Sequence, residues 1–240
     1  MFLSSFYQTD GAAISISAEQ GSHFAKSVAG DFNPIHDPGH RRFCIPGDLL
    51  FAIAVQHFGL SQTMQVQFKS LVDADQRLFL PASTPETSPQ HHTIHDDRER
   101  VIMALTQSGQ TSLENARIEQ LVRAYVAFSG QNFPHVLVPL LEQHQVMFHP
   151  KRPFVIYDSM SLQLDRLDFK NPTLELTERT LKESDRRADV TLSFVWKDGE
   201  DIIGTGSKTL IIGGLQAYDA EAMAVVVADF LAARENYRVA

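Results

Sequence analysis

The sequence predicts an α+β protein in which antiparallel strands wrap around a buried helix, and this arrangement occurs twice along the chain. The first observation is the run 46–58, which opens with Pro-Gly-Asp and whose apolar residues leave no polar face for water. Such a helix needs a sheet around it, and it is too short to cross a bilayer. The second observation is that strand-like segments follow this helix, and the third is that the same order of helices and strands returns after residue 113.

Composition limits the classes of partner and compartment. The chain has 29 acidic and 21 basic residues, a net charge of −8, which argues against nucleic acid as a partner. The single cysteine, Cys44, forbids an internal disulfide and fits a reducing compartment, so we expect a cytoplasmic protein. We expect Cys44 to be a small buried residue rather than a nucleophile. The apolar start 1–7 is short and lacks a basic flank, so neither a signal peptide nor a membrane partner is expected.

The chain is expected to enter its first half through two short strands, 1–7 and 12–16. A helix over 18–28 follows. Ser17 is its expected N-cap, and Gln20 stands at the capping-box position three residues later. This helix delivers the chain to the segment that carries the candidate chemistry.

That segment, 29–39, is polar and broken by glycine and proline, so its side chains can converge. A carboxylate and an imidazole, Asp31 and His36, suit general acid–base catalysis on a water. The alternative is that Asp31 and Asn33 are turn residues that bond their own backbone. At the start of the buried helix, free N–H groups such as that of Gly47 can donate to a developing oxyanion, unless Gly47 only relieves a tight turn.

The remaining elements follow from alternation and from helical spacing. After the buried helix, strands are expected at 65–72, 76–82, 91–95 and 100–107, with a surface loop at 83–90. Residues 108–112 predict a linker, so we divide the chain into halves 1–108 and 109–240. The second half predicts a helix at 113–128, strands at 154–164, 173–181, 188–196 and 201–212, and a closing helix at 217–236.

The second half also contains a weak copy of the candidate segment. Residues 129–135, SGQNFPH, follow AGDFNPIH after one hundred positions, with Gly130 at the place of Gly30. Gln131 stands where Asp31 stands in the first copy, and an amide cannot act as a base. We therefore expect one active half and one supporting half.

The segment AGDFNPIH resembles the G-D-x-N-P-I-H signature of the MaoC-like, R-specific enoyl-CoA hydratases. The following FCIPGDLL, 43–50, resembles the start of the central helix in that family. The resemblance covers residues 13–72 and implies the hot-dog fold. Together with the duplication, it implies a double hot-dog: two antiparallel sheets, each wrapped around a central helix, that form a pseudo-dimer.

The resemblance implies a hydro-lyase that reversibly hydrates a trans-2-enoyl thioester of coenzyme A or acyl carrier protein, without a cofactor. It implies that Asp31 and His36 hold the reacting water, that the Gly47 N–H polarises the thioester carbonyl, and that the second half forms tunnel wall. The residues expected to support the loop or contact substrate are Asn33, Pro46 and Phe51. Two positions depart from the family: Pro46 stands where a His is common, and Pro38, next to Asp37, where an Asp is common.

Other functions stay open at this point. The chain is alternatively a non-catalytic acyl-thioester-binding protein, which would not need the Asp31–His36 pair, or a thioesterase. Three basic residues, Arg41, Arg42 and Lys69, either meet the phosphates of the carrier or serve solubility. Exposed sheet edges and the last helix make a homodimer plausible.

A metal site and a nucleotide site are not expected. In a strand, His91 and His95 share one face while His92 lies on the other, and no cysteine or carboxylate stands at ligand spacing. The glycines between 204 and 214 lie within or at the end of a strand, whereas a phosphate loop joins a strand to a helix.

Overall fold

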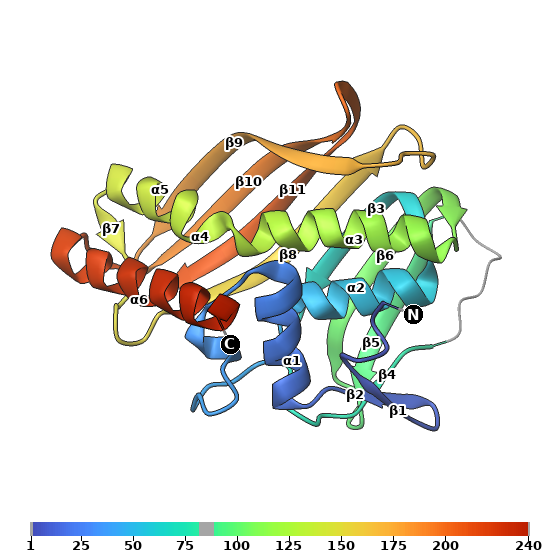
Figure 1. Cartoon of the computed structure of the whole chain (residues 1–240), viewed down its shortest axis with the longest axis horizontal. Coiled ribbons are helices and arrows are strands. Elements are labelled where there is room, and N and C mark those ends of the chain that lie inside the picture. Colours follow the sequence, from blue (N-terminus) through green and yellow to red (C-terminus); the bar gives the residue numbers. More distant parts are fainter. Residues whose placement is uncertain (1, 82–88, 240) are drawn as a thin grey trace.

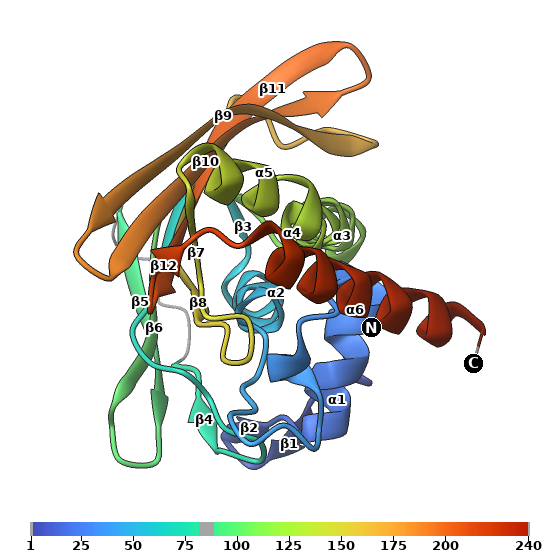
Figure 2. The same ribbon diagram turned by 90° about the vertical axis from the view of Figure 1, so that its left-hand side faces the viewer.

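Helix α2, Gly47–Phe58, is the centre of the first half and is buried along most of its length, as its sequence predicts. The computed structural model describes residues 2–81 and 89–239 of the chain. Pro46 is the N-cap of α2, and its carbonyl oxygen accepts from the N–H groups of Leu49 and Leu50. Because α2 has almost no water-facing side, the sheet curves around it, as Figure 2 shows.

Within the described residues, ten strands form one antiparallel sheet with the order β1-β2-β4-β5-β6-β3-β8-β11-β10-β9. A separate two-stranded sheet joins β7 to β12. The strands are β1 Gln8–Asp10, β2 Ala13–Ser15, β3 Leu60–Phe68, β4 Leu78–Phe79, β5 Gln90–Asp96, β6 Val101–Ser112, β7 Val146–Met147, β8 Val155–Leu164, β9 Pro172–Ser184, β10 Arg187–Asp198, β11 Asp201–Gly213 and β12 Gln216–Ala217.

The large sheet repeats itself about the contact between β3 and β8. Outward from β3 the order is β6, β5, β4, and outward from β8 it is β11, β10, β9, so each half places its strands in the same chain order. Backbone pairing of Thr63–Gln67 with Ser159–Gln163 joins the two halves. The fold is therefore a double hot-dog, and its two sheets are continuous with one another.

The helices cover one face of this sheet (Figure 1). The capping box predicted at Ser17 is present: the Gln20 N–H donates to Ser17 Oγ at 3.2 Å, and the Ser17 N–H donates to Gln20 Oε1 at 3.0 Å. The larger hydrophobic core surrounds α2 and α3, and a smaller one lies under α5. The helices are α1 Ala18–Phe24, continued by the π-helical η1 Ala25–Ala29, then α3 Asn115–Gly130, α4 Asn132–His135, α5 Leu137–Gln143 and α6 Ala220–Val239.

The two copies of the duplicated segment meet back to back where α3 packs on η1. A Cβ added to Gly130 would lie 2.0 Å from the Ala29 carbonyl oxygen and 3.1 Å from the Asp31 nitrogen. Only a glycine allows this approach, because the atoms facing it belong to the backbone. The end of the second copy thus supports the chain that carries the first.

Several local predictions are wrong. Residues 2–7 form turns rather than a strand, and β3 begins at Leu60 instead of residue 65. The expected linker 108–112 is the last part of β6, where Ser112 pairs with Leu60. The expected strand 76–82 is reduced to two residues in β4.

The predicted loop 83–90 and the division of the chain into two halves are not tested by the described residues. Most of the predicted loop 83–90 falls outside the described residues, and its last residue, Gln90, begins β5. We retain the division into 1–108 and 109–240 as a proposal. Within residues 2–81 and 89–239, none of the helices combines the length and hydrophobicity that crossing a bilayer requires.

Candidate active site

A left-handed glycine directs the candidate loop away from η1. Gly30 has φ 70° and ψ 24°, a conformation that glycine adopts without a steric penalty. The N–H groups of Gly30 and Asp31 both donate to the Ala25 carbonyl oxygen, the latter at 2.8 Å. These bonds fix the backbone from which the Asp31 carboxylate projects.

Asp31 and Asn33 are turn residues, as the alternative interpretation holds. Asp31 Oδ1 accepts from the Asn33 N–H at 2.9 Å, and Asn33 Oδ1 accepts from the Ile35 N–H at 3.2 Å. The second bond caps a single 3₁₀ turn, η2, Pro34–His36, inside a segment for which the sequence predicts no regular helix. Because the turn uses only Oδ1 of Asp31, its Oδ2 is left to face His36.

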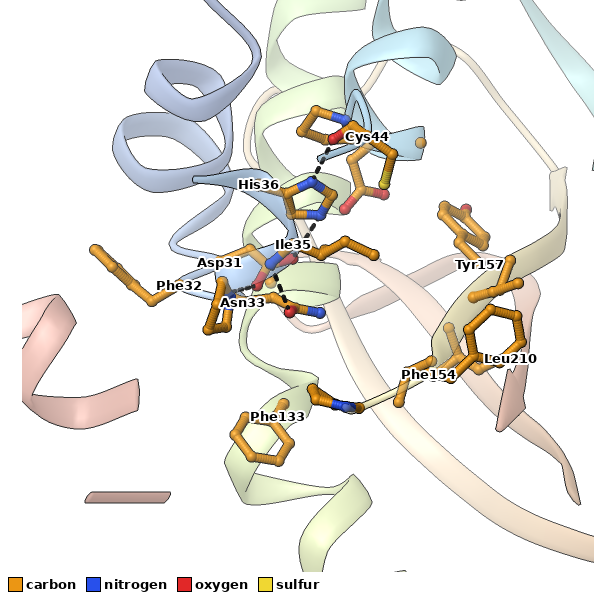
Figure 3. A pocket seen from close by; sticks show the side chains of 18 of the residues that line it. Asp31, Phe32, Asn33, Ile35, His36, Cys44, Phe133, Phe154, Tyr157 and Leu210 are labelled. Atoms are coloured by element: carbon orange, nitrogen blue, oxygen red, sulfur yellow. Dashed lines mark hydrogen bonds and ion pairs between the residues drawn. The ribbon is translucent and has the colours of Figure 1, made fainter. Parts of the chain in front are cut away.

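The imidazole of His36 has its tautomer fixed by the backbone. Its Nδ1 lies 2.8 Å from the Cys44 carbonyl oxygen, which can only accept, so Nδ1 carries the hydrogen. In the neutral ring Nε2 is then an acceptor, and it lies 3.7 Å from Asp31 Oδ2 (Figure 3). This separation exceeds a direct hydrogen bond. It suits one water that donates one hydrogen to each acceptor.

This pair lies in the wall of a cavity of about 370 Å³ that is built from both halves. The side chains of His36 and Asp31 are 11% and 26% exposed, so both reach the cavity without being fully solvated. Figure 3 shows Phe154, Tyr157 and Leu210 across the cavity from them. Other apolar lining residues include Phe68, Leu71, Phe133, Ile156, Val226 and Phe230.

Helix α6 closes one side of the cavity next to the loop. The ring of Phe230 lies 5.9 Å from that of Phe32, the neighbour of Asp31, and Tyr237 packs on Phe32 at 5.7 Å. The Tyr237 hydroxyl is 3.0 Å from His23 Nδ1. The last helix therefore shields Phe32, which is buried, from solvent.

The start of α2 faces the same cavity. Gly47 lines it, and a Cβ on Gly47 would lie 3.0 Å from Tyr157 Cδ1 and 3.4 Å from Phe68 Cζ. The first N–H groups of a helix have no acceptor within it. The Gly47 N–H therefore has no acceptor within α2, and Gly47 adjoins the cavity.

The structure brings five of the six predicted site residues to this cavity. Asn33 and Pro46 line it beside Asp31, His36 and Gly47. Phe51 does not, because it is fully buried and packs edge-on against the Tyr125 ring at 5.0 Å. We therefore leave Phe51 out of the proposed site.

Three polar residues of the cavity wall escaped the sequence analysis as functional candidates. Asp48, Ser129 and Lys208 are each less than a tenth exposed and line the cavity. Ser129 Oγ donates to Asp48 Oδ2 at 2.6 Å and accepts from Lys208 Nζ. Burial raises the pKa of Asp48 and lowers that of Lys208. The sequence signal for Lys208 is a lysine at an inward position of the alternating strand β11.

The other reactive side chains have structural surroundings. Cys44 is buried, as expected, and burial together with the charges of Asp31 and Asp73 raises the pKa of its thiol to about 12, which makes it a poor nucleophile. Arg41, Arg42 and Lys69 are exposed and do not line the cavity. Gln131, the counterpart of Asp31, is also exposed.

The three histidines of β5 lie as the alternation predicts. His91 and His95 bond the hydroxyls of Thr106 and Thr93 on one face, while His92 stacks on Phe58 at 4.1 Å on the buried face. In the part of the chain that the structure describes, no three His, Cys, Asp or Glu side chains gather as metal ligands.

Comparison with known proteins gives a family and a set of weak structural likenesses. A family model described as "Protein of unknown function (DUF3581)" matches residues 1–221. No curated protein matches the sequence significantly.

Among solved structures, a MaoC-like dehydratase aligns at 9% identity over 85% of this chain and 97% of its own, with a TM-score of 0.44. A hot-dog protein of unknown function from Alicyclobacillus acidocaldarius aligns at 11% over 91% and 99%, with a TM-score of 0.47. An acyl-CoA thioesterase II, TesB2, from Mycobacterium marinum aligns at 10% over 89% and 96%, with a TM-score of 0.44. At such scores, the fold assignment rests on the strand order of the chain itself.

Proposed function

The chain belongs to the DUF3581 family, whose description states no function, and from its site we propose that the protein is a MaoC-like hydro-lyase. The proposed reaction is the reversible hydration of a trans-2-enoyl thioester to a 3-hydroxyacyl thioester. The acyl carrier is coenzyme A or acyl carrier protein. No cofactor takes part in this proposal.

The proposed chemistry uses the Asp31–His36 pair for both proton transfers. The water oxygen forms a bond to C3 of the enoyl group while the pair takes one of its protons. The electrons of the C2–C3 double bond move toward the thioester oxygen, where the Gly47 N–H stabilises the developing charge. C2 then takes a proton from the pair, which restores the starting protonation state and balances the addition.

One observation carries the proposal: two proton acceptors of the same cavity wall face one point. Asp31 Oδ2 and His36 Nε2 lie 3.7 Å apart, and the Cys44 carbonyl holds the imidazole in the tautomer that makes Nε2 an acceptor. A protein that only binds acyl chains needs an apolar cavity, but it does not need this arrangement. A lone carboxylate for thioester hydrolysis would not need the fixed imidazole either.

The test follows crotonyl-CoA by two signals at once. Hydration removes the absorbance of the conjugated thioester without releasing thiol, whereas hydrolysis releases coenzyme A, which a thiol reagent detects. We expect the wild type to give the first signal alone. We expect Asp31→Asn and His36→Ala each to lower kcat by about 10²–10⁴-fold, the usual range for an acid–base group.

A matched control comes from the second copy of the segment. His135 is the histidine of SGQNFPH, but it is exposed and does not line the cavity, so His135→Ala should keep wild-type turnover. Hydration that survives in both Asp31→Asn and His36→Ala would exclude the proposed pair. Thiol release would identify a thioesterase, and binding without turnover would identify an acyl-thioester-binding protein.

A further inference from the structure

A lysine occupies an interior position of β11, where apolar residues are the rule. Lys208 is 5% exposed and precedes Leu210 and Ile212 on the same inward-facing row, which are 7% and 0% exposed. Lysine is rarely buried to this extent unless it is paired. The contacts of the Lys208 ammonium group should therefore explain why this side chain is buried.

The ammonium of Lys208 belongs to a chain of contacts that joins three elements. Lys208 Nζ donates to Ser129 Oγ near the end of α3, and it lies 4.0 Å from the centroid of the Tyr157 ring. Ser129 in turn donates to Asp48 Oδ2 at 2.6 Å, in the first turn of α2. Because Ser129 gives its one hydroxyl proton to Asp48, its oxygen is left to accept from Lys208 Nζ.

This chain of contacts ends beside the proposed oxyanion donor. Asp48 directly follows Gly47, and the same Tyr157 ring that carries Lys208 Nζ lies 3.0 Å from the position of a Cβ on Gly47. The same cavity that Asp31 and His36 line is also lined by Gly47, Asp48, Ser129, Tyr157 and Lys208. The Lys208 ammonium and the start of α2 therefore both lie next to the Tyr157 ring, in the same part of the cavity wall.

Lys208 and Asp48 both have hydrogen-bonding groups that the contacts described above do not use. An ammonium carries three N–H donors, and in the described part of the chain one of them meets a hydrogen-bond acceptor, Ser129 Oγ. The buried Asp48 Oδ1 has no partner among the described residues either. A substrate that displaces water from the cavity would leave the ammonium poorly solvated unless it offered an acceptor of its own.

The charges around Lys208 indicate which acceptor fits. Asp48 already balances its charge, and Asp31 adds a second negative charge that also acts on Lys208. A carboxylate on the substrate would thus meet two like charges. An uncharged oxygen that gains negative charge only during the reaction fits better, and the thioester carbonyl is such an oxygen.

We propose that Lys208 is a catalytic residue that donates a hydrogen bond to the thioester carbonyl oxygen of the substrate, together with the Gly47 N–H. Ser129 and Asp48 are its positioning residues. The inference rests on the proposed hydration, which it deepens by adding a full positive charge where the enolate oxygen forms.

The kinetic test replaces Lys208 with an uncharged residue of similar length. Lys208→Met alone would leave the Asp48 carboxylate buried without its counter-charge, so Asp48→Asn/Lys208→Met is made beside it to keep a folded protein. In the double variant we expect kcat for crotonyl-CoA to fall by about 10²–10³-fold with a small change in KM, the pattern for a contact made chiefly in the transition state. Asp48→Asn alone keeps the ammonium and serves as the reference. Lys182→Met, at an exposed lysine of β9, is the surface control.

The second readout does not depend on turnover. Crotonyl-CoA labelled at its carbonyl carbon is bound to the Asp31→Asn/Asp48→Asn protein with and without Lys208→Met, and infrared spectroscopy measures the C=O stretch. Loss of a hydrogen bond raises this frequency, so we expect a higher value without Lys208. A merely structural lysine would not move it.

The outcomes separate this inference from the function on which it rests. A wild type that does not hydrate crotonyl-CoA, together with a Lys208-dependent C=O shift, would retain Lys208 as a carbonyl donor and remove the hydro-lyase. A wild type that hydrates, with an unchanged C=O frequency and a double variant within about threefold of Asp48→Asn, would overturn the role of Lys208. Normal turnover of crotonyl-CoA without Lys208 would also overturn the role of Lys208. The lysine would then meet some other group, such as an oxygen farther along a longer acyl chain, which crotonyl-CoA lacks.

Discussion

Replacing Gly130 by alanine tests how closely the two copies of the duplicated segment are packed. The added Cβ would lie 2.0 Å from the Ala29 carbonyl oxygen and 2.7 Å from its carbon, whereas real Cβ atoms stay beyond 3.0 Å. At least 1.0 Å of separation must therefore open between α3 and η1, from the difference 3.0 − 2.0. Both contacted atoms belong to the backbone, so no side-chain rotation can relieve the clash.

The magnitude follows from two opposing effects. Overpacking in a well-packed interior destabilises by about 1–3 kcal/mol, and a backbone clash belongs at the upper end of that range. Alanine is a better helix former than glycine by up to about 1 kcal/mol, which offsets part of the loss at the end of α3. We expect a net loss of about 2 kcal/mol, and for a chain of this size a fall in Tm of about 4–8 °C.

The assay is a thermal melt, read beside turnover of crotonyl-CoA. Gly39→Ala is the matched control, because a Cβ at Gly39 meets nothing within 4 Å and its backbone is not left-handed. Turnover should fall as well in Gly130→Ala, since the displaced backbone includes the Asp31 nitrogen, 3.1 Å from the new Cβ. A melting temperature equal to that of Gly39→Ala would show that α3 and η1 are not in such close contact.

Three further predictions concern Cys44 and Ser17. With its pKa raised from 9.0 to about 12, the Cys44 thiol of the native protein should carry on the order of 10³-fold less thiolate at pH 8 than the same thiol in the unfolded chain. Iodoacetamide should therefore alkylate Cys44 far more slowly in the native protein than in urea. Comparable rates would contradict the burial of Cys44. The same raised pKa contributes stability that is complete below the unfolded pKa and is lost as pH rises through the folded value, so Cys44→Ala should weaken the loss of Tm at alkaline pH. Ser17→Ala removes the capping box and should lower stability by about 1 kcal/mol in a urea titration, and an unchanged midpoint would show that the box contributes nothing.

The elements that sequence reasoning predicted well are those whose cause is local. The helix α2 follows from a run without a polar face, and the start of α1 from the Ser17–Gln20 pair. The pairing of Asp31 with His36 was expected because glycine and proline break the segment 29–39, so that its side chains can converge. Each of these features depends on residues within one or two turns of chain.

The predictions that failed depend on partners far along the chain. Residues 108–112 have the composition of a linker, yet they pair with the start of β3, where Ser61 and Thr111 join their hydroxyls at 2.6 Å. Neither segment shows an apolar alternation, because each satisfies its polar groups on the other. The site residues Ser129 and Lys208 were missed for the same reason, since their partner Asp48 is 81 and 160 positions away.

The cavity lies across the junction of the two halves, and this limits how the chain can change during evolution. The Asp31–His36 pair belongs to the first half, while Tyr157, Ser129 and the ammonium of Lys208 belong to the second. Gene fission, or a cut between the halves, would leave two fragments that each hold an incomplete set of groups. Two identical subunits would have to keep both sets in every copy, whereas the fused chain lets each half specialise, and once it has done so the fusion is difficult to reverse.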